Sequence, residues 1–166
     1  MNKILIIGIS GTGKTKLAKK LSNIFKIPIT HYDELVWGEG WKEVDEKIVE
    51  QKLNEAVKKD KWIIEGYIQP AAKIKLEKAD VVIYLDYSGF QAMIGGLQRW
   101  WQYRGKTRPE MAAGCIEKFD WDFLKVMWKR EERPEIEEAI KGFENKVIRI
   151  KTRREADKFL TKLHKK

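Results

Sequence analysis

A glycine-rich segment near the start of the chain combines the residue types and the spacing that phosphate binding requires. Residues 8–15 read GISGTGKT, which satisfies the P-loop pattern G-x-x-x-x-G-K-[ST]. Glycines let such a loop turn its backbone amides toward phosphate oxygens, and the start of the following helix adds amides and a favourable dipole. We therefore predict that a nucleoside triphosphate binds through these loop residues: Gly8, Ser10, Gly11, Thr12, Gly13, Lys14 and Thr15.

Two side chains of this loop have separate predicted roles. Lys14 is expected to reach the β- and γ-phosphates, and the Thr15 hydroxyl is expected to bind Mg²⁺. A glycine turn with an incidental lysine is the alternative interpretation. Against it, the segment follows an apolar run and opens an amphipathic stretch, as a P-loop must.

Acidic residues at the ends of apolar runs are candidates to complete the metal site. Glu65 ends WIIEG, Asp86 ends VVIYLD, and Asp33 lies in THYDELVW after another short run. Glu65 and Asp86 are alternatively structural strand ends, and Asp33 is alternatively a helix N-cap or a group that orients an acceptor hydroxyl. His31 is expected to pack at a strand end rather than to take part in catalysis.

Cationic residues between positions 99 and 133 form the second candidate for phosphate chemistry. Phosphoryl transfer builds negative charge on equatorial oxygens, and the planar guanidinium of arginine suits them. The stretch YRGKTRPEMAAGC is polar and basic with two glycines and a proline, which predicts a lid inserted at about residues 103–118. A solvated basic loop and a nucleic-acid contact surface are the alternatives. The cations concerned are Arg99, Arg104, Lys106, Arg108, Arg130 and Arg133.

Three aromatic residues are candidates to line an acceptor pocket. Trp37 and Trp41 bracket Gly-Glu-Gly in a segment with little secondary-structure signal, and Tyr67 follows a predicted strand. Tryptophans in such a position either belong to the core or wall a substrate pocket. The sequence leaves both interpretations of the two tryptophans open.

Alternating elements must position these residues. Short apolar runs predict strands at residues 3–7, 28–31, 62–64, 81–85 and 147–150. Helical spacing of apolar residues predicts helices at residues 14–25, 45–58 and 90–101. A capping box of Thr152 and Glu155 begins a last helix. Continuous apolar strands separated by helices indicate an α/β fold with a parallel sheet covered on both faces.

The composition limits the class of protein. A length of 166 residues suits one domain, predicted to span 1–166, and the apolar runs are too short for a membrane span. Cys115 is the only cysteine, which excludes an internal disulfide and a cysteine-built zinc site and makes a cytoplasmic location the default. The net charge of +9 favours anionic partners, either a nucleotide or a nucleic acid.

The motifs together resemble the DNA topology modulation proteins (FlaR-like), P-loop proteins related to adenylate kinases. The resemblance covers nearly the whole chain and rests on the P-loop, HYDELVW, WIIEGY, VVIYLD, YRGKTRPEMAAGCIEKFD and VIRIKTRREADKFL. It implies a nucleoside-monophosphate-kinase fold, a three-layer sandwich whose five-stranded parallel sheet has the order 2-3-1-4-5. It also implies a lid between the fourth strand and the last.

The resemblance further implies roles for individual residues. Glu65 and Gly66 match the Asp-Gly pair that ends strand three in adenylate kinases, so Glu65 is expected to hold Mg²⁺ through water, and Asp86 becomes a structural strand end. Tyr67 follows where adenylate kinases have an arginine that binds the acceptor phosphate, which argues against an AMP-like acceptor. The lid-side phosphate ligands would be Arg99, Arg104 and Arg108, with Arg130 or Arg133 closing from the far side.

The leading hypothesis is a small kinase that transfers the γ-phosphoryl group of ATP, with Mg²⁺, to an unidentified small-molecule or nucleotide acceptor. A nucleotide-dependent DNA-binding or regulatory protein is the alternative, and plain NTP hydrolysis is a third possibility. The predicted catalytic residues are Lys14, Asp33, Glu65, Arg99, Arg104, Arg108 and Arg133. The predicted acceptor contacts are Asp33, Trp37, Trp41, Gly66, Tyr67 and Arg130.

Overall fold

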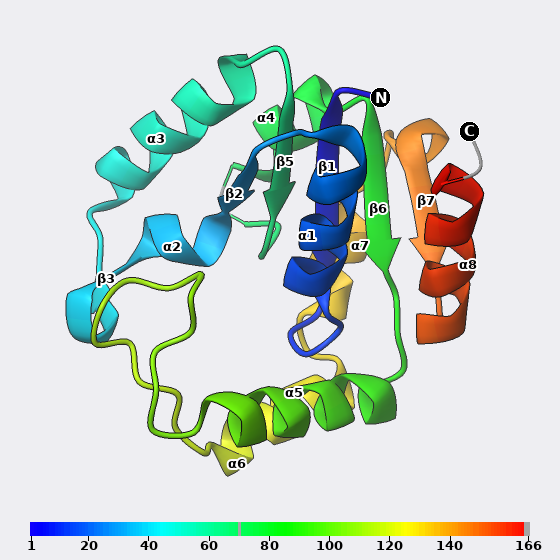
Figure 1. Ribbon diagram of the computed structural model, residues 1–166. Helices are drawn as coiled ribbons and strands as arrows, with labels where there is room; N and C mark the ends of the chain where they lie inside the picture. The colour runs from blue at the N-terminus through cyan, green and yellow to red at the C-terminus, as the bar shows by residue number, and fades with distance from the viewer. Residues whose placement is uncertain (70, 165–166) are drawn as a thin grey trace.

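A five-stranded parallel sheet forms the centre of the molecule (Figure 1). The computed structural model describes residues 1–69 and 71–164. Across the sheet the strands are β2 (Ile29–His31), β5 (Trp62–Glu65), β1 (Lys3–Gly8), β6 (Val81–Leu85) and β7 (Val147–Ile150). Numbered by their order along the chain within this sheet, they run 2-3-1-4-5. The predicted fold class and strand order are therefore confirmed.

Alternating side chains on the central strands give the sheet two apolar faces. Ile4 and Ile6 of β1 lie in one buried cluster, and Leu5 and Ile7 lie in the other. The first face is covered by α1 (Lys14–Phe25) and α8 (Arg153–His164). The opposite face is covered by α3 (Glu46–Lys58), α4 (Ala72–Lys78), α6 (Trp121–Lys129) and α7 (Arg133–Ala139). Both faces are thus removed from water, as continuous apolar strands require.

Two of the predicted helix starts, at Asp45 and Thr152, have a side-chain cap in the structure. Asp45 accepts a hydrogen bond from the Lys47 amide at the start of α3. Thr152 Oγ1 accepts one from the Glu155 amide at 3.1 Å, which is one half of the predicted capping box, whereas the Glu155 carboxylate accepts from the Lys151 amide instead of that of Thr152. The short α2 (Tyr32–Val36) begins after His31 as its N-cap, so Asp33 lies in the first turn and not at the cap.

Two irregular segments pack against each other beside the sheet. One contains the two-residue strands β3 (Trp37–Gly38) and β4 (Lys42–Glu43), joined by the 3₁₀ turn η1 (Glu39–Trp41). The other is the connection after α5 (Gly89–Tyr103), which has only isolated bridges such as that between Thr107 and Ile116. We call residues 103–118 the connecting loop. Neither segment belongs to the central sheet.

Helix α5 packs on the P-loop through glycines. A Cβ added to Gly95 would lie 1.9 Å from the Gly11 carbonyl oxygen, and one added to Gly11 would lie 2.1 Å from the Ala92 carbonyl oxygen. Gly96, the next residue, faces the Met127 side chain of α6 instead. A glycine weakens a helix interior, so the presence of Gly95 in α5 is explained by this close approach of backbone to backbone.

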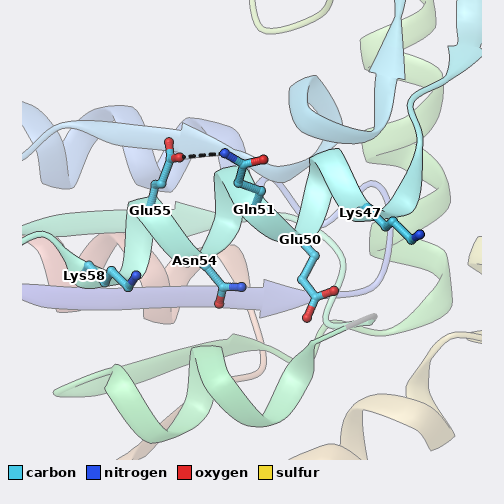
Figure 2. A pocket seen from close by; sticks show the side chains of 6 residues that line it. All are labelled: Lys47, Glu50, Gln51, Asn54, Glu55 and Lys58. Atoms are coloured by element: carbon cyan, nitrogen blue, oxygen red, sulfur yellow. Dashed lines mark hydrogen bonds between the residues drawn. The ribbon is translucent and has the colours of Figure 1, made fainter.

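A shallow hollow lies along the outer side of α3 (Figure 2), where Gln51 Nε2 donates to Glu55 Oε1 at 3.3 Å. Its lining comes from this one helix: Lys47, Glu50, Gln51, Asn54, Glu55 and Lys58. In the part of the chain that the structure describes, no helix has the length and apolar character to cross a membrane.

Candidate functional site

The P-loop connects β1 to α1 at the carboxyl end of the sheet. Gly11 and Gly13 have φ values of +80° and +87°, a region that favours glycine, and Gly13 is the N-cap of α1. The buried Thr12 hydroxyl donates to the Ile9 carbonyl at 2.8 Å and fixes the turn from inside. The conformation of the loop is therefore fixed by its glycines and by the hydrogen bond of Thr12.

Lys14 extends back along the loop rather than into solvent. Its Nζ donates to the Gly8 carbonyl at 2.8 Å and to the Ile9 carbonyl at 3.1 Å. The ammonium group therefore lies beside the first residues of the loop. A phosphate bound by the loop amides would meet this charge at short range.

Thr15 and Glu65, the two residues predicted to hold Mg²⁺, are in direct contact. The Thr15 Oγ1 donates to Glu65 Oε1 at 2.9 Å. Glu65 ends β5, the neighbour of β1, and is buried. Hydroxyl and carboxylate oxygens suit Mg²⁺, which usually takes one or two protein ligands and completes its shell with phosphate and water. The residues present thus fit the metal.

Thr15 and Glu65 are not part of a larger cluster of metal ligands among the described residues. Within residues 1–69 and 71–164, no group of three or more His, Cys, Asp and Glu side chains is arranged to hold a metal ion. A Mg²⁺ ion brought in with a nucleotide does not need such a cage, because the phosphates supply further oxygen ligands.

His31, which the sequence predicts to pack at a strand end, also belongs to this site. Its Nδ1 lies 2.6 Å from Glu65 Oε1 because His31 and Glu65 are register partners on β2 and β5. Burial lowers the pKa of His31, but the hydrogen bond to Glu65 and the negative charges of Glu65, Glu110 and Glu34 together raise it above its ordinary value. Burial raises the pKa of Glu65, yet His31 and the charge of Lys14 bring it below its ordinary value. An ionised carboxylate and an imidazolium are therefore favoured.

Two of the predicted lid arginines are joined to one carboxylate. Arg99 Nε forms an ion pair with Glu117 Oε1 at 2.8 Å, and Arg108 Nε lies 3.1 Å from Glu117 Oε2. Arg108 and Glu117 are both buried. Arg104 instead lies over the exposed Trp101 ring, 4.0 Å from its centroid. Glu117 is thus shared by Arg99 and Arg108, and their role as phosphate ligands stays a prediction.

Arg130 and Arg133 converge on Asp86, immediately after β6. Arg130 Nη2 donates to Asp86 Oδ1, and Arg133 Nε donates to the same oxygen at 3.1 Å. Arg149, from β7, donates to Asp86 Oδ2 at 2.7 Å. Burial raises the pKa of Asp86, but the bonds from Arg133 and Arg149 bring it below its ordinary value. Asp86 is thus an ionised carboxylate that holds three arginines beside the P-loop strand.

A second carboxylate touches the P-loop directly. Both oxygens of Glu132 accept hydrogen bonds from Ser10, one from its backbone amide at 2.5 Å and one from its Oγ at 2.9 Å. The two residues are 122 positions apart. Local sequence patterns give no sign of this contact.

The predicted acceptor contacts divide into two groups. Trp37 and Trp41 meet edge to face, with 5.6 Å between their ring centroids, and Trp41 Nε1 donates to the Ile116 carbonyl at 3.1 Å. They therefore lie against the connecting loop. Tyr67 points elsewhere, because its hydroxyl donates to Glu135 of α7.

Gly66 has a structural reason to be glycine. Its φ is +139°, and an added Cβ would lie 2.7 Å from the Cβ of Tyr32. The chain thus turns sharply after Glu65 and passes close to the start of α2. Asp33 lies in the first turn of the same helix.

The same fold occurs in solved kinase structures. A shikimate kinase from Acinetobacter baumannii, in complex with shikimate, superposes with a TM-score of 0.62 at 18% identity, over 99% of this chain and 92% of that one. A deoxyadenosine kinase from M. mycoides, with the products dCMP and dCDP bound, gives 0.53 at 16% identity, over 98% of each chain. No family model and no curated protein sequence matches the chain. The chain therefore has the P-loop kinase fold, and its resemblance to the FlaR-like proteins stays a prediction.

Proposed function

We propose that the chain is a Mg²⁺-dependent phosphotransferase that moves the γ-phosphoryl group of ATP to a small acceptor. The observation that carries this proposal is the 2.9 Å contact between Thr15 Oγ1 and Glu65 Oε1, beside a P-loop that contains Lys14. A glycine loop alone would account for phosphate binding. The adjoining buried carboxylate adds a place for the metal that phosphoryl transfer needs.

Each residue of the site has a distinct task in this proposal. The loop amides hold the phosphates, and the Lys14 ammonium balances the charge that develops as the γ-phosphoryl group leaves. Bound Mg²⁺ would neutralise phosphate oxygens from the side of Thr15 and Glu65. His31 keeps the Glu65 carboxylate ionised and fixes its direction through the 2.6 Å contact.

The connecting loop, residues 103–118, is proposed as the lid of a single domain spanning 1–166. It contacts the segment of Trp37 and Trp41 at several points: the Gly40 amide donates to the Ala113 carbonyl at 3.0 Å, Trp41 Nε1 donates to the Ile116 carbonyl, and the Cys115 thiol bonds to Gly38 and Trp41. A lid closed over this segment would exclude water from the transfer, which separates a kinase from a simple ATPase.

The acceptor is proposed to be a small hydroxyl compound without a phosphate group. Tyr67 stands where adenylate kinases have their acceptor-binding arginine. Arg99 and Arg108 already share Glu117 as a partner, and Arg130 and Arg133 already share Asp86. Those contacts also count against the DNA-binding alternative that the FlaR-like resemblance suggests, because a nucleic acid would have to compete with these carboxylates for the arginines.

A thermal-shift screen followed by a transfer assay tests the proposed function. A non-hydrolysable ATP analogue with Mg²⁺ should raise the melting temperature, because a ligand that binds the native state stabilises it. A library of polyols, nucleosides and nucleotides is then added, and ADP release is measured with each compound. Acceptor-dependent ADP release supports the kinase, whereas release that no compound increases would identify an NTPase.

Glu65→Gln is expected to reduce transfer about 10- to 100-fold and to raise the Mg²⁺ concentration required for half-maximal rate. The amide keeps the shape of Glu65 but removes the charge that attracts the metal and that pairs with His31. The rate is measured while Mg²⁺ is titrated at saturating ATP. Glu55→Gln, on the exposed side of α3, is the control. An unchanged Mg²⁺ requirement in Glu65→Gln would remove Glu65 from the metal site.

A further inference from the structure

The Glu132 carboxylate occupies the P-loop in the manner of a bound anion. It accepts from the Ser10 amide at 2.5 Å and from the Ser10 hydroxyl at 2.9 Å, so both of its oxygens are used. Carboxylate and phosphate oxygens are both anionic acceptors, and donors that suit one suit the other. The loop therefore already holds a negative group that comes from its own chain.

The position of Lys14 indicates which phosphate this carboxylate resembles. In P-loops the lysine reaches the β- and γ-phosphates. Here its Nζ binds the carbonyls of Gly8 and Ile9, directly before Ser10. Glu132 therefore binds the loop next to the residues that the Lys14 side chain reaches, where the terminal phosphate of a triphosphate is expected.

The turn that carries Glu132 also carries two cations. Arg130 and Arg133 flank Glu132 and both bind Asp86. Arg130 has a φ of +59°, an unfavourable conformation for a residue other than glycine, and its Nε is a buried donor without a hydrogen-bond partner among the described residues. The turn of residues 130–133 therefore has an unfavourable backbone conformation at Arg130, and the Nε of this residue is available to bind a further acceptor.

We propose that Glu132 is an internal competitor for the terminal phosphate of ATP, and that its expulsion releases the turn of residues 130–133. Two anions cannot share the donors of Ser10, so a bound triphosphate displaces the carboxylate. The turn then moves with it, and Arg130 and Arg133 can exchange Asp86 for phosphate oxygens. This inference rests on the proposed function and assigns a regulatory contact to the same site.

Glu132→Gln is the direct test, because the amide keeps the size of the side chain and loses its charge. We expect its Kd for a non-hydrolysable ATP analogue with Mg²⁺ to fall about tenfold, the value of one charged hydrogen bond. The Kd for ADP should change much less, since ADP lacks the competing phosphate. Glu131→Gln is the matched control, because Glu131 is exposed and pairs with Lys129. Isothermal titration calorimetry gives all of these values.

The alternative is that Glu132 only braces the loop. In that case Glu132→Gln would bind the ATP analogue and ADP with the affinities of the wild type, or would bind both nucleotides more weakly. Either result overturns the proposal. Glu132→Ala, which also removes the carboxylate, should give the same selective gain if the glutamine variant folds poorly. If the wild type binds nucleotide and the Glu132 variants bind it with the same affinity, this inference alone is contradicted. Wild-type protein that binds no nucleotide contradicts the proposed function as well.

Discussion

Replacing Lys14 with alanine is expected to lower the rate of phosphoryl transfer by at least about 10²- to 10³-fold, the usual loss when one preorganised charge-stabilising donor is removed. Lys14 Nζ lies 2.8 Å from the Gly8 carbonyl, so its charge is held directly against the loop that binds the phosphates. The loss should appear mainly in kcat, because the charge matters most when negative charge shifts between the phosphates. ADP release with saturating ATP, Mg²⁺ and acceptor measures it.

The matched control for Lys14→Ala is Lys16→Ala. Lys16 lies on the same first turn of α1 but is exposed. It carries the same formal charge and should leave the rate within about twofold, since surface charges interact weakly with a site across solvent. Retention of full activity in Lys14→Ala, with a melting temperature like that of the wild type, would show that the loop is not the site of transfer.

Replacing Gly95 with alanine is expected to damage both stability and nucleotide binding. The new Cβ would lie 1.9 Å from the Gly11 carbonyl oxygen, so either α5 or the P-loop must move. Overpacking of this kind costs about 1–3 kcal/mol or more, and alanine returns only about 1 kcal/mol through its better helix propensity. We expect a net loss, visible as a melting temperature several degrees lower and as weaker binding of the ATP analogue.

Gly96→Ala is the matched control for Gly95→Ala. It makes the same chemical change one residue later in the same helix. Its Cβ would lie 2.7 Å from Met127 Sδ, a flexible side chain that can move aside, whereas Gly95 faces a backbone oxygen. The helix gain of about 1 kcal/mol should therefore roughly offset the adjustment, and nucleotide affinity should stay near that of the wild type. Equal effects of the two substitutions would contradict a special contact between α5 and the loop.

The parts of the molecule that local sequence determines were predictable. The apolar runs of the five sheet strands and the P-loop motif are contiguous, and the order of the sheet followed from the resemblance. The β3–β4 hairpin was missed because its strands are two residues long. Helices α4 and α7, of seven residues each, are too short to show a helical period reliably.

In the candidate site, too, the residues that belong to local motifs were predictable and the others were not. Thr15 and Glu65 were predicted because each belongs to a motif of its own. His31 and Arg149 were not, because their roles depend on the register of β2 with β5 and of β6 with β7. Glu117 and Glu132 were missed for a different reason: a carboxylate that will pair with a distant residue looks like any surface acid in the sequence.

Cys115 gives the chain a natural reporter for its own movement. It is the only cysteine, and it is fully buried, with its thiol donating to the Gly38 carbonyl and accepting from the Trp41 amide. A thiol reagent can reach it only when the connecting loop separates from the segment of Trp37 and Trp41. With a reagent that reacts faster than the two segments close again, the rate of alkylation therefore equals the rate at which they separate. Opening kinetics can be read from the wild-type protein in this way, without an engineered label.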